Sequence, residues 1–88
     1  MAMEMVYTHR LHPDDWRRQF ADTVQDMHIS TLPLACHMCG YHYISDVSPM
    51  GRMTAVRMYG YEVLGQIVFQ IQNDRVRRVT FYQPIAED

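Results

Sequence analysis

Cys36 and Cys39 are the residues of this chain whose type and spacing point most directly to chemistry. They are its only two cysteines, and Gly40 follows them directly. A two-residue gap suits half of a tetrahedral zinc site when the backbone turns so that both thiolates converge, and Gly40 can adopt the positive φ that such a turn needs. His9 and His12 repeat the gap upstream. One interpretation is therefore a structural zinc site made by these four side chains.

Two other interpretations compete with zinc. The run from Leu34 to Met38 also reads as a plain strand in which Cys36 is a small buried hydrophobe, and the histidine gap is shorter than that of common zinc sites. Redox chemistry of the thioredoxin type would need Cys36 exposed at a helix N-terminus, whereas strand formers follow Gly40. Simple packing is the favoured interpretation, and the expected cofactor is none, with zinc as the alternative.

Catalysis by histidine is a further possibility. A general base near neutral pH could come from any of five histidines, with Asp46 to orient it and Tyr41 or Tyr43 to donate a proton. No activated serine and no paired carboxylates accompany them. The sequence therefore favours a binding protein over an enzyme. The five are His9, His12, His28, His37 and His42.

Length and composition indicate one small globular domain over residues 1–88. The chain is 48% hydrophobic and 20% charged, a composition that is ordinary for a folded domain. Its net charge of -2 argues against strong nonspecific binding to polyanions. No basic and apolar leader is visible at the N-terminus, and no apolar run approaches the roughly 20 residues that cross a bilayer. We expect a cytoplasmic protein that does not enter membranes.

The chain pattern predicts an α+β fold in the order β-α-β-β-β-β, with one amphipathic helix on a four- to five-stranded, mainly antiparallel sheet. The helix is expected from Pro13 to about Met27, because proline and two aspartates open it and apolar residues recur at helical spacing. Asn73-Asp74 predicts a two-residue hairpin turn, and Gly60 another tight connection. The strands are expected over residues 5–11, 34–44 with a bulge at Gly40, 52–59, 61–72 and 76–82, with residues 1–4 and 84–88 frayed.

Apolar residues on both faces of the 61–72 strand suggest that a second copy or a partner covers what one helix cannot. The expected function is a small non-enzymatic protein-binding module, homodimeric, acting as adaptor or inhibitor, such as a phage or mobile-element inhibitor of a host complex. The expected contact residues are Met50, Arg52, Met53, Arg57, Tyr59, Tyr61, Arg75 and Arg78.

Two alternatives remain open for the function. One is a small RNA- or DNA-binding domain that uses the sheet as a stacking platform. The other is a cupped-sheet enzyme or ligand carrier that uses histidine. The platform of the first would combine Tyr41, Tyr43, Tyr59, Tyr61 and Tyr82 with Arg52, Arg57, Arg75, Arg77 and Arg78.

Overall fold

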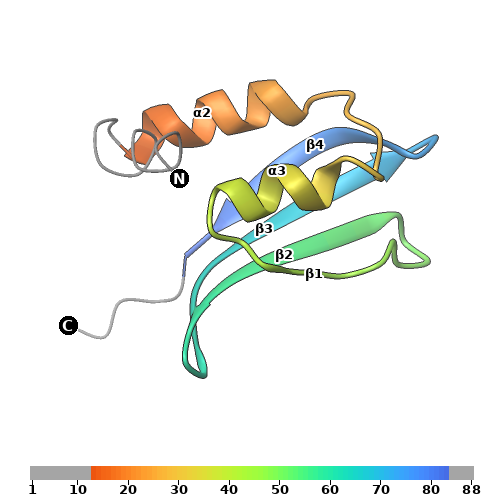
Figure 1. Ribbon diagram of the computed structural model, residues 1–88. Coiled ribbons are helices and arrows are strands. Elements are labelled where there is room, and N and C mark those ends of the chain that lie inside the picture. The colour runs from red at the N-terminus through yellow and green to blue at the C-terminus, as the bar shows by residue number, and fades with distance from the viewer. Residues whose placement is uncertain (1–12, 84–88) are drawn as a thin grey trace.

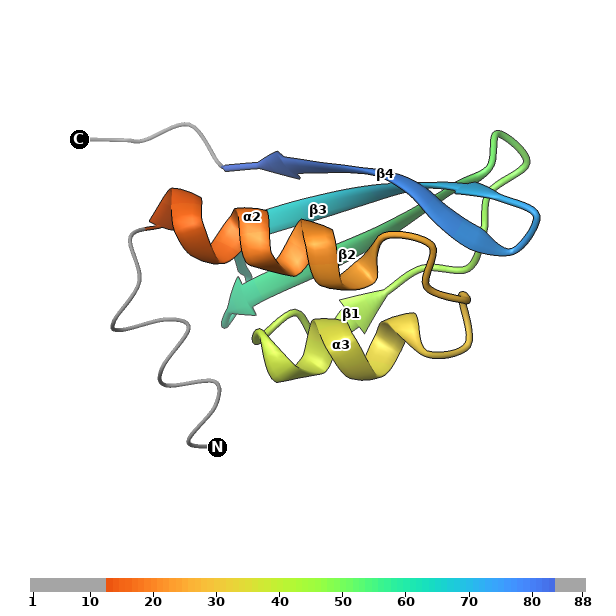
Figure 2. The same ribbon diagram turned by 90° about the horizontal axis from the view of Figure 1, so that it is seen from above.

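The computed structural model describes residues 13–83 as two helices packed on one face of a four-stranded antiparallel sheet (Figures 1 and 2). The strands lie in the order β1-β2-β3-β4. An α+β fold with an antiparallel sheet is thus confirmed, and the strand expected at 5–11 lies outside the described residues. The elements are α2 (Pro13–Val24), α3 (Leu32–Met38), β1 (Tyr43–Ile44), β2 (Arg52–Tyr59), β3 (Glu62–Gln72) and β4 (Arg75–Tyr82).

Helix α2 begins at Pro13 as predicted but ends at Val24 rather than near Met27. Asp26 leaves the helical conformation with a φ of 65°. Its backbone N–H donates to the Val76 carbonyl, and the Val76 N–H donates to the Met27 carbonyl. Pairing with β4 therefore satisfies backbone groups that another helical turn would otherwise have used.

The expected strand at 34–44 is wrong over most of its length, because Leu32–Met38 forms helix α3 and only Tyr43–Ile44 pairs with β2. The helical segment contains no β-branched residue, and Pro33 stands in its first turn, where proline is tolerated. Leu32 and Cys36 are both fully buried, as residues four apart on one helical face should be. Seven residues are too few for that period to stand out in the sequence.

Gly40 ends helix α3 and is not a strand bulge. Its φ is 88°, its N–H donates to the His37 carbonyl, and the Tyr41 N–H donates to the Cys36 carbonyl. These two bonds are the pair that defines a Schellman motif, in which a residue of positive φ follows the last helical turn. Gly40 thus has the positive φ expected of it, but that conformation ends a helix and does not form a strand bulge.

The three long strands agree closely with the sequence pattern. Asn73 and Asp74 form the predicted turn between β3 and β4, with φ of 55° and 63°, as a type I′ hairpin requires. Gly60, with a φ of 61°, opens the turn between β2 and β3. Register shifts follow Arg57 on β2 and Gln70 on β3, so each of these two hairpins contains a bulge.

The core lies between the helices and the inner sheet face. No polar or charged side chain is buried among the described residues, and an aromatic cluster joins the layers, with Phe20 of α2 6.2 Å from both Phe69 and Phe81 between ring centroids. Tyr41 lies across Gly65, where an added Cβ would come within 2.6 Å of its hydroxyl oxygen. The fully buried large side chains are Phe69, Leu32, Ile67, Val24, Val76 and Cys36.

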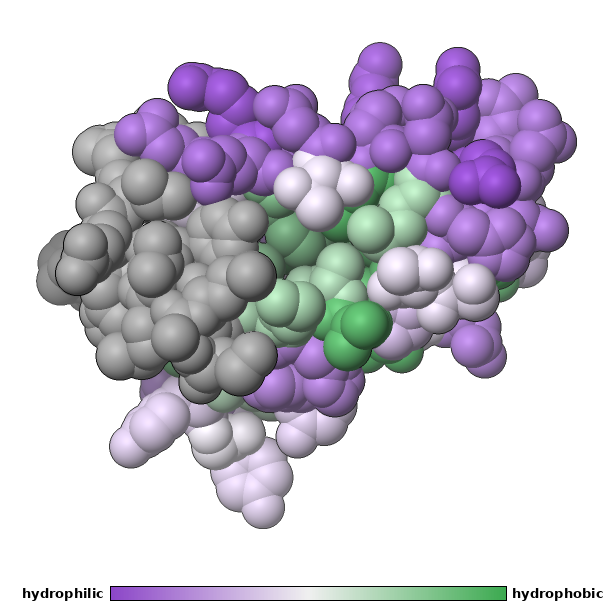
Figure 3. All heavy atoms as spheres, turned by 45° about the horizontal axis from the view of Figure 1, so that its top comes forward, coloured by the Kyte–Doolittle hydropathy of each residue, from purple (hydrophilic) through white to green (hydrophobic). Residues whose placement is uncertain are grey.

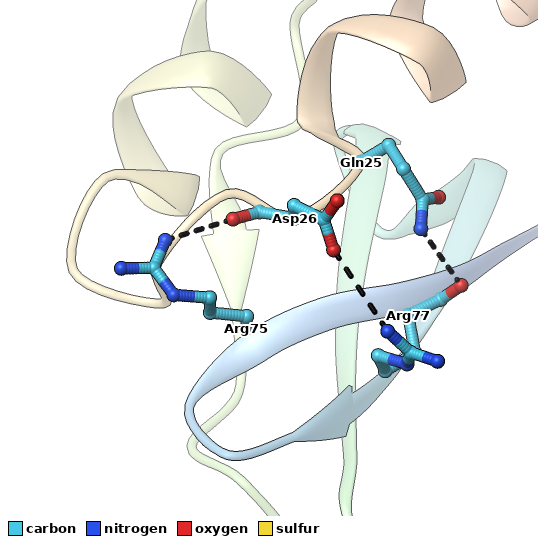
Figure 4. Close-up of polar contacts among 4 residues, drawn as sticks. All are labelled: Gln25, Asp26, Arg75 and Arg77. Atoms are coloured by element: carbon cyan, nitrogen blue, oxygen red, sulfur yellow. Dashed lines mark hydrogen bonds and ion pairs between the residues drawn. The ribbon is translucent and has the colours of Figure 1, made fainter.

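Polar contacts tie the end of α2 to β4 (Figure 4). The Arg75 guanidinium donates to the Asp26 carbonyl at 2.9 Å, and the Gln25 amide donates to the Arg77 carbonyl at 3.2 Å. Arg77 also lies 4.0 Å from the Asp26 carboxylate, an exposed pair worth little by itself. Arg75 and Arg77 thus have structural partners.

Neither described helix is long and apolar enough to cross a membrane.

Two leucines of α3 give a direct test of the helix. Leu32 is fully buried and Leu34 is 65% exposed. We expect Leu32→Ala to lower the free energy of unfolding by about 2–5 kcal/mol, and Leu34→Ala to change it by less than about 0.5 kcal/mol, measured by urea denaturation. In a strand, residues 32 and 34 would share a face, so equal losses would contradict the helix.

Gly65 gives a second test, of the contact with Tyr41. Gly65→Ala should destabilise the protein by about 1–3 kcal/mol through overpacking. The new methyl group would meet the Tyr41 side chain, which is buried and rigid and so has little room to move. The same substitution in a Tyr41→Ala background should cost markedly less. Additive losses in this double-mutant cycle would show that the two residues are not coupled.

Candidate binding face

The sheet face opposite the helices, called here the open face, is a candidate contact surface of the described residues. Because paired residues of neighbouring strands point to the same side, the register identifies its members. Tyr43, Arg52, Gln70, Arg78 and Tyr82 are exposed, and the others are partly exposed. The open face consists of Tyr43, Arg52, Thr54, Val56, Gln66, Val68, Gln70, Arg78, Thr80 and Tyr82.

These side chains form three rows across the strands. Arg52, Gln70 and Arg78 make a cationic row, and the next row joins Thr54, Val68 and Thr80. A third row adds two tyrosines at the opposite end. Strand spacing places the two arginine Cα atoms about 9–10 Å apart, on either side of Gln70. The third row is Tyr43, Val56, Gln66 and Tyr82.

Charge is distributed unevenly between the two sides of the molecule. No member of the open face is acidic, and within residues 13–83 neither Arg52 nor Arg78 has an ion-pair partner. Acidic side chains lie instead on α2, in the connecting segments and at the start of β3. The open face is therefore locally positive although the whole chain has a net charge of -2.

The open face is hollowed rather than flat. A shallow depression of about 430 Å³ lies over all three rows. It is lined by Arg52, Thr54, Gln66, Val68, Gln70, Thr80 and Tyr82. It continues past Arg52 and Gln70 into a depression of about 320 Å³ beside Met50, and past Gln66 and Tyr82 into one of about 290 Å³ beside Val63. The three depressions share lining residues and therefore adjoin one another along the sheet.

The predicted contact residues fall in different places. Arg52 and Arg78 lie on the open face, and Met50 is 75% exposed at its edge. Tyr59 and Tyr61, 76% and 100% exposed, stand at the hairpin between β2 and β3. Met50, Arg52 and Arg78 therefore lie at one end of the sheet, whereas Tyr59 and Tyr61 lie at the opposite end of β2.

The other predicted contact residues lie elsewhere. Met53 is 6% exposed and belongs to the core, so its thioether is not available to a partner. Arg57 lies beside Gly40 on the helix side, and Arg75 holds the Asp26 carbonyl. The predicted contact set omitted Tyr43 and Tyr82. Alternation with Arg78 and Thr80 could have found Tyr82, but only the β1 pairing places Tyr43.

The helix side of the molecule has a different character (Figure 3). Apolar atoms gather between α2 and α3, with polar groups above and to the right of them in this view. Met27 and Ala35 pack against the core while staying partly exposed, and Leu34 is largely exposed. This surface offers apolar contact, whereas the open face offers charge, hydroxyl groups and aromatic rings.

Both cysteines lie inside the domain, and neither is in a disulfide. Cys36 is fully buried and Cys39 is 8% exposed. Burial, with a smaller contribution from Cys39, raises the pKa of the Cys36 thiol from 9.0 to about 12. Burial also raises the pKa of Tyr41, which Arg57 and Arg17 partly offset. Of the four predicted zinc ligands, Cys36 and Cys39 therefore lie together at the buried end of α3, and His9 and His12 lie outside the described residues.

The described histidines lie at two places, His28 beside Ser30 and His37 beside His42. The His28 Nδ1 accepts the Ser30 backbone N–H at 3.1 Å and lies 2.9 Å from the Ser30 hydroxyl oxygen, which makes a local turn. No hydrogen bond or ion pair joins the Asp46 carboxylate to a histidine within residues 13–83. Over the same range no three His, Cys, Asp or Glu residues are grouped for a metal ion.

Comparison of the chain with models of known protein families, with curated proteins and with solved structures gives no match.

Burial of Cys36 predicts how stability depends on pH. An acid whose pKa is raised by folding stabilises the folded state fully below its unfolded pKa, and this contribution is lost as pH rises through the folded pKa. For Cys36 the window runs from 9.0 to about 12. In urea unfolding at stepped alkaline pH, the wild type should lose stability faster than Cys36→Ala, by up to about 1.4 kcal/mol per pH unit. Parallel profiles would contradict the buried thiol.

Proposed function

We propose that this chain is a small non-enzymatic protein-binding module, an adaptor or inhibitor, that recognises its partner through the open face. The observation that supports this function is an uncovered sheet face on which Arg52 and Arg78 lack carboxylate partners among the described residues. A guanidinium offers planar, bidentate hydrogen bonding. A partner that supplies carboxylates in this position would satisfy both groups.

The residue types of this surface are those that dominate protein interfaces. Tyrosine, arginine and methionine are enriched in contact areas and among the residues that contribute most to affinity. Tyr43, Tyr82 and Met50 provide large contact area around the depression. Val68 supplies an apolar centre between two threonines. Cationic, hydroxyl and aromatic rows in a defined order allow a partner to be selected by shape as well as charge.

A second copy of the chain suits the open face less well than a different protein does. The homodimer expected from the sequence would cover apolar side chains that one helix leaves exposed, and α3 already covers part of that inner surface with Leu32 and Cys36. On the open face, two copies would bring four arginines together without a carboxylate from residues 13–83. A different partner therefore fits this face better than a second copy does.

Single-stranded nucleic acid is the second candidate partner. The tyrosine row and the arginine row favour it, because bases stack on aromatic rings and phosphates pair with cations. Two unpaired cations would give only a small salt dependence, of about −0.7 per phosphate contact. The net charge of -2 also opposes approach of a polyanion, so we place a protein partner first.

Site-specific photocrosslinking tests the protein-binding proposal. A benzophenone amino acid at Thr80 should give one discrete protein adduct in the cells that produce the chain, whereas the same probe at the exposed Gln19 or at Leu34 of the helix side should not. Excess unlabelled wild type should suppress the adduct. Excess Arg52→Glu/Arg78→Glu should not, whereas Arg18→Glu/Arg57→Glu, a matched charge change off the face, should compete like the wild type.

Several outcomes would contradict this proposal. An adduct from Leu34 but not Thr80 would move the interface to the helix side, and an adduct of twice the chain mass would make the partner a second copy. Fluorescence anisotropy with labelled oligothymidine separates the second candidate. Binding that Tyr43→Ala/Tyr82→Ala abolishes would favour nucleic acid over protein. The arginine and tyrosine substitutions are all at exposed positions, so stability should change by less than about 0.5 kcal/mol each.

A further inference from the structure

His37 and His42 are brought together by the turn that ends helix α3. His37 lies in the last helical turn and His42 follows Tyr41. Their Nδ1 atoms are 3.3 Å apart, and their rings are nearly perpendicular, with centroids 4.7 Å apart. Both side chains are exposed. Two imidazole nitrogens therefore face each other at the surface, next to solvent.

The distance between these nitrogens is that of two ligands on one metal ion. Zinc–nitrogen bonds of about 2.0–2.1 Å at a tetrahedral angle place the two nitrogens about 3.3–3.4 Å apart. As a hydrogen bond, the same contact holds a single proton between two neutral rings. A metal ion would take the place of that proton, which moves to Nε2 of its own ring so that both rings stay neutral and both Nδ1 lone pairs are available. The ion would lie off the line between the two nitrogens, and the rings can reorient toward it because both side chains are exposed.

The backbone holds the two histidines in place without any metal. The Gly40 N–H donates to the His37 carbonyl at 3.0 Å, and the Tyr41 N–H donates to the Cys36 carbonyl at 2.9 Å. Tyr41, between Gly40 and His42, is 3% exposed and packs on the sheet. A pair positioned by a closed turn and a buried anchor loses little conformational freedom when it binds an ion.

We propose that His37 and His42 bind one divalent late first-row transition-metal ion, such as Cu²⁺, Ni²⁺ or Zn²⁺, through both Nδ1 atoms, with water in the remaining positions. Imidazole suits these ions and not Mg²⁺ or Ca²⁺, and affinity should be highest for Cu²⁺. With two protein ligands the site is weaker than a four-ligand structural zinc site. It is distinct from the His9, His12, Cys36 and Cys39 site, and it does not depend on the proposed function.

Calorimetric titration of the full chain with CuCl₂, NiCl₂ or ZnCl₂ tests the site. The wild type should bind one ion at His37 and His42, and His37→Gln or His42→Gln should each weaken that binding by about tenfold or more, since even removal of outer-shell partners costs 10–100-fold. His28→Gln is the matched control, because His28 is also exposed but its Nδ1 contacts Ser30. Its affinity should equal that of the wild type.

A His9→Gln/His12→Gln variant separates this site from the one inferred from the sequence. It should retain the ion at His37 and His42. In amide NMR spectra, Ni²⁺ or Cu²⁺ should perturb the signals of residues around 37–42. The other amide signals should keep their positions, which shows that the protein stays folded. The proposal is overturned if the wild type binds no ion, if both glutamine variants bind normally, or if binding is lost only with His9 and His12.

Discussion

The contact of Tyr41 with Gly65 is the constraint on which the arrangement of the helix layer depends. Tyr41 directly follows the glycine that ends α3, and its ring occupies the space that a side chain at position 65 would fill. Its ring also lies 6.4 Å from that of Trp16 on α2. One buried residue thus joins the end of one helix, the start of the other and the central strand. Gly65 has an ordinary φ, so the glycine serves close approach and not an unusual backbone.

The contact between Tyr41 and Gly65 also determines where the side chains around Cys36 and Cys39 lie. Closing the helix with Gly40 and placing Tyr41 against the sheet turns Cys36 inward, where desolvation keeps the thiol protonated. The residues on either side of the turn, His37 and His42, are turned outward by the same geometry. The motif that suggests metal chemistry in the sequence therefore buries its sulfur atoms and presents imidazoles.

Charge separation between the two sides of the sheet has a simple origin in the strands. Arg52 and Arg78 flank Gln70 because β2 and β4 both pair with β3. Asp26 lies on the helix side, where it engages Arg77 and, through its carbonyl, Arg75. Arginines of similar sequence context are thus divided between a structural role at the end of α2 and a place on the open face with no ion-pair partner within residues 13–83. Strand parity does not separate Arg75 from Arg78, because the bulge after Gln70 pairs them with Gln72 and Gln70, which share a face of β3. The hydrogen bond from Arg75 to the Asp26 carbonyl separates them.

The sequence by itself determined the start of α2, the three long strands and the Asn73-Asp74 turn, because each depends on local signals: an N-terminal proline, alternating apolar residues, and residues that accept positive φ. Tertiary structure decided the rest. Residues 32–38 became helix because Leu32 and Cys36 could be buried together, and α2 stopped early because Asp26 and Met27 pair with Val76. That Tyr43 joins the open face, and that His37 meets His42, followed from strand pairing and helix termination, which no local pattern encodes.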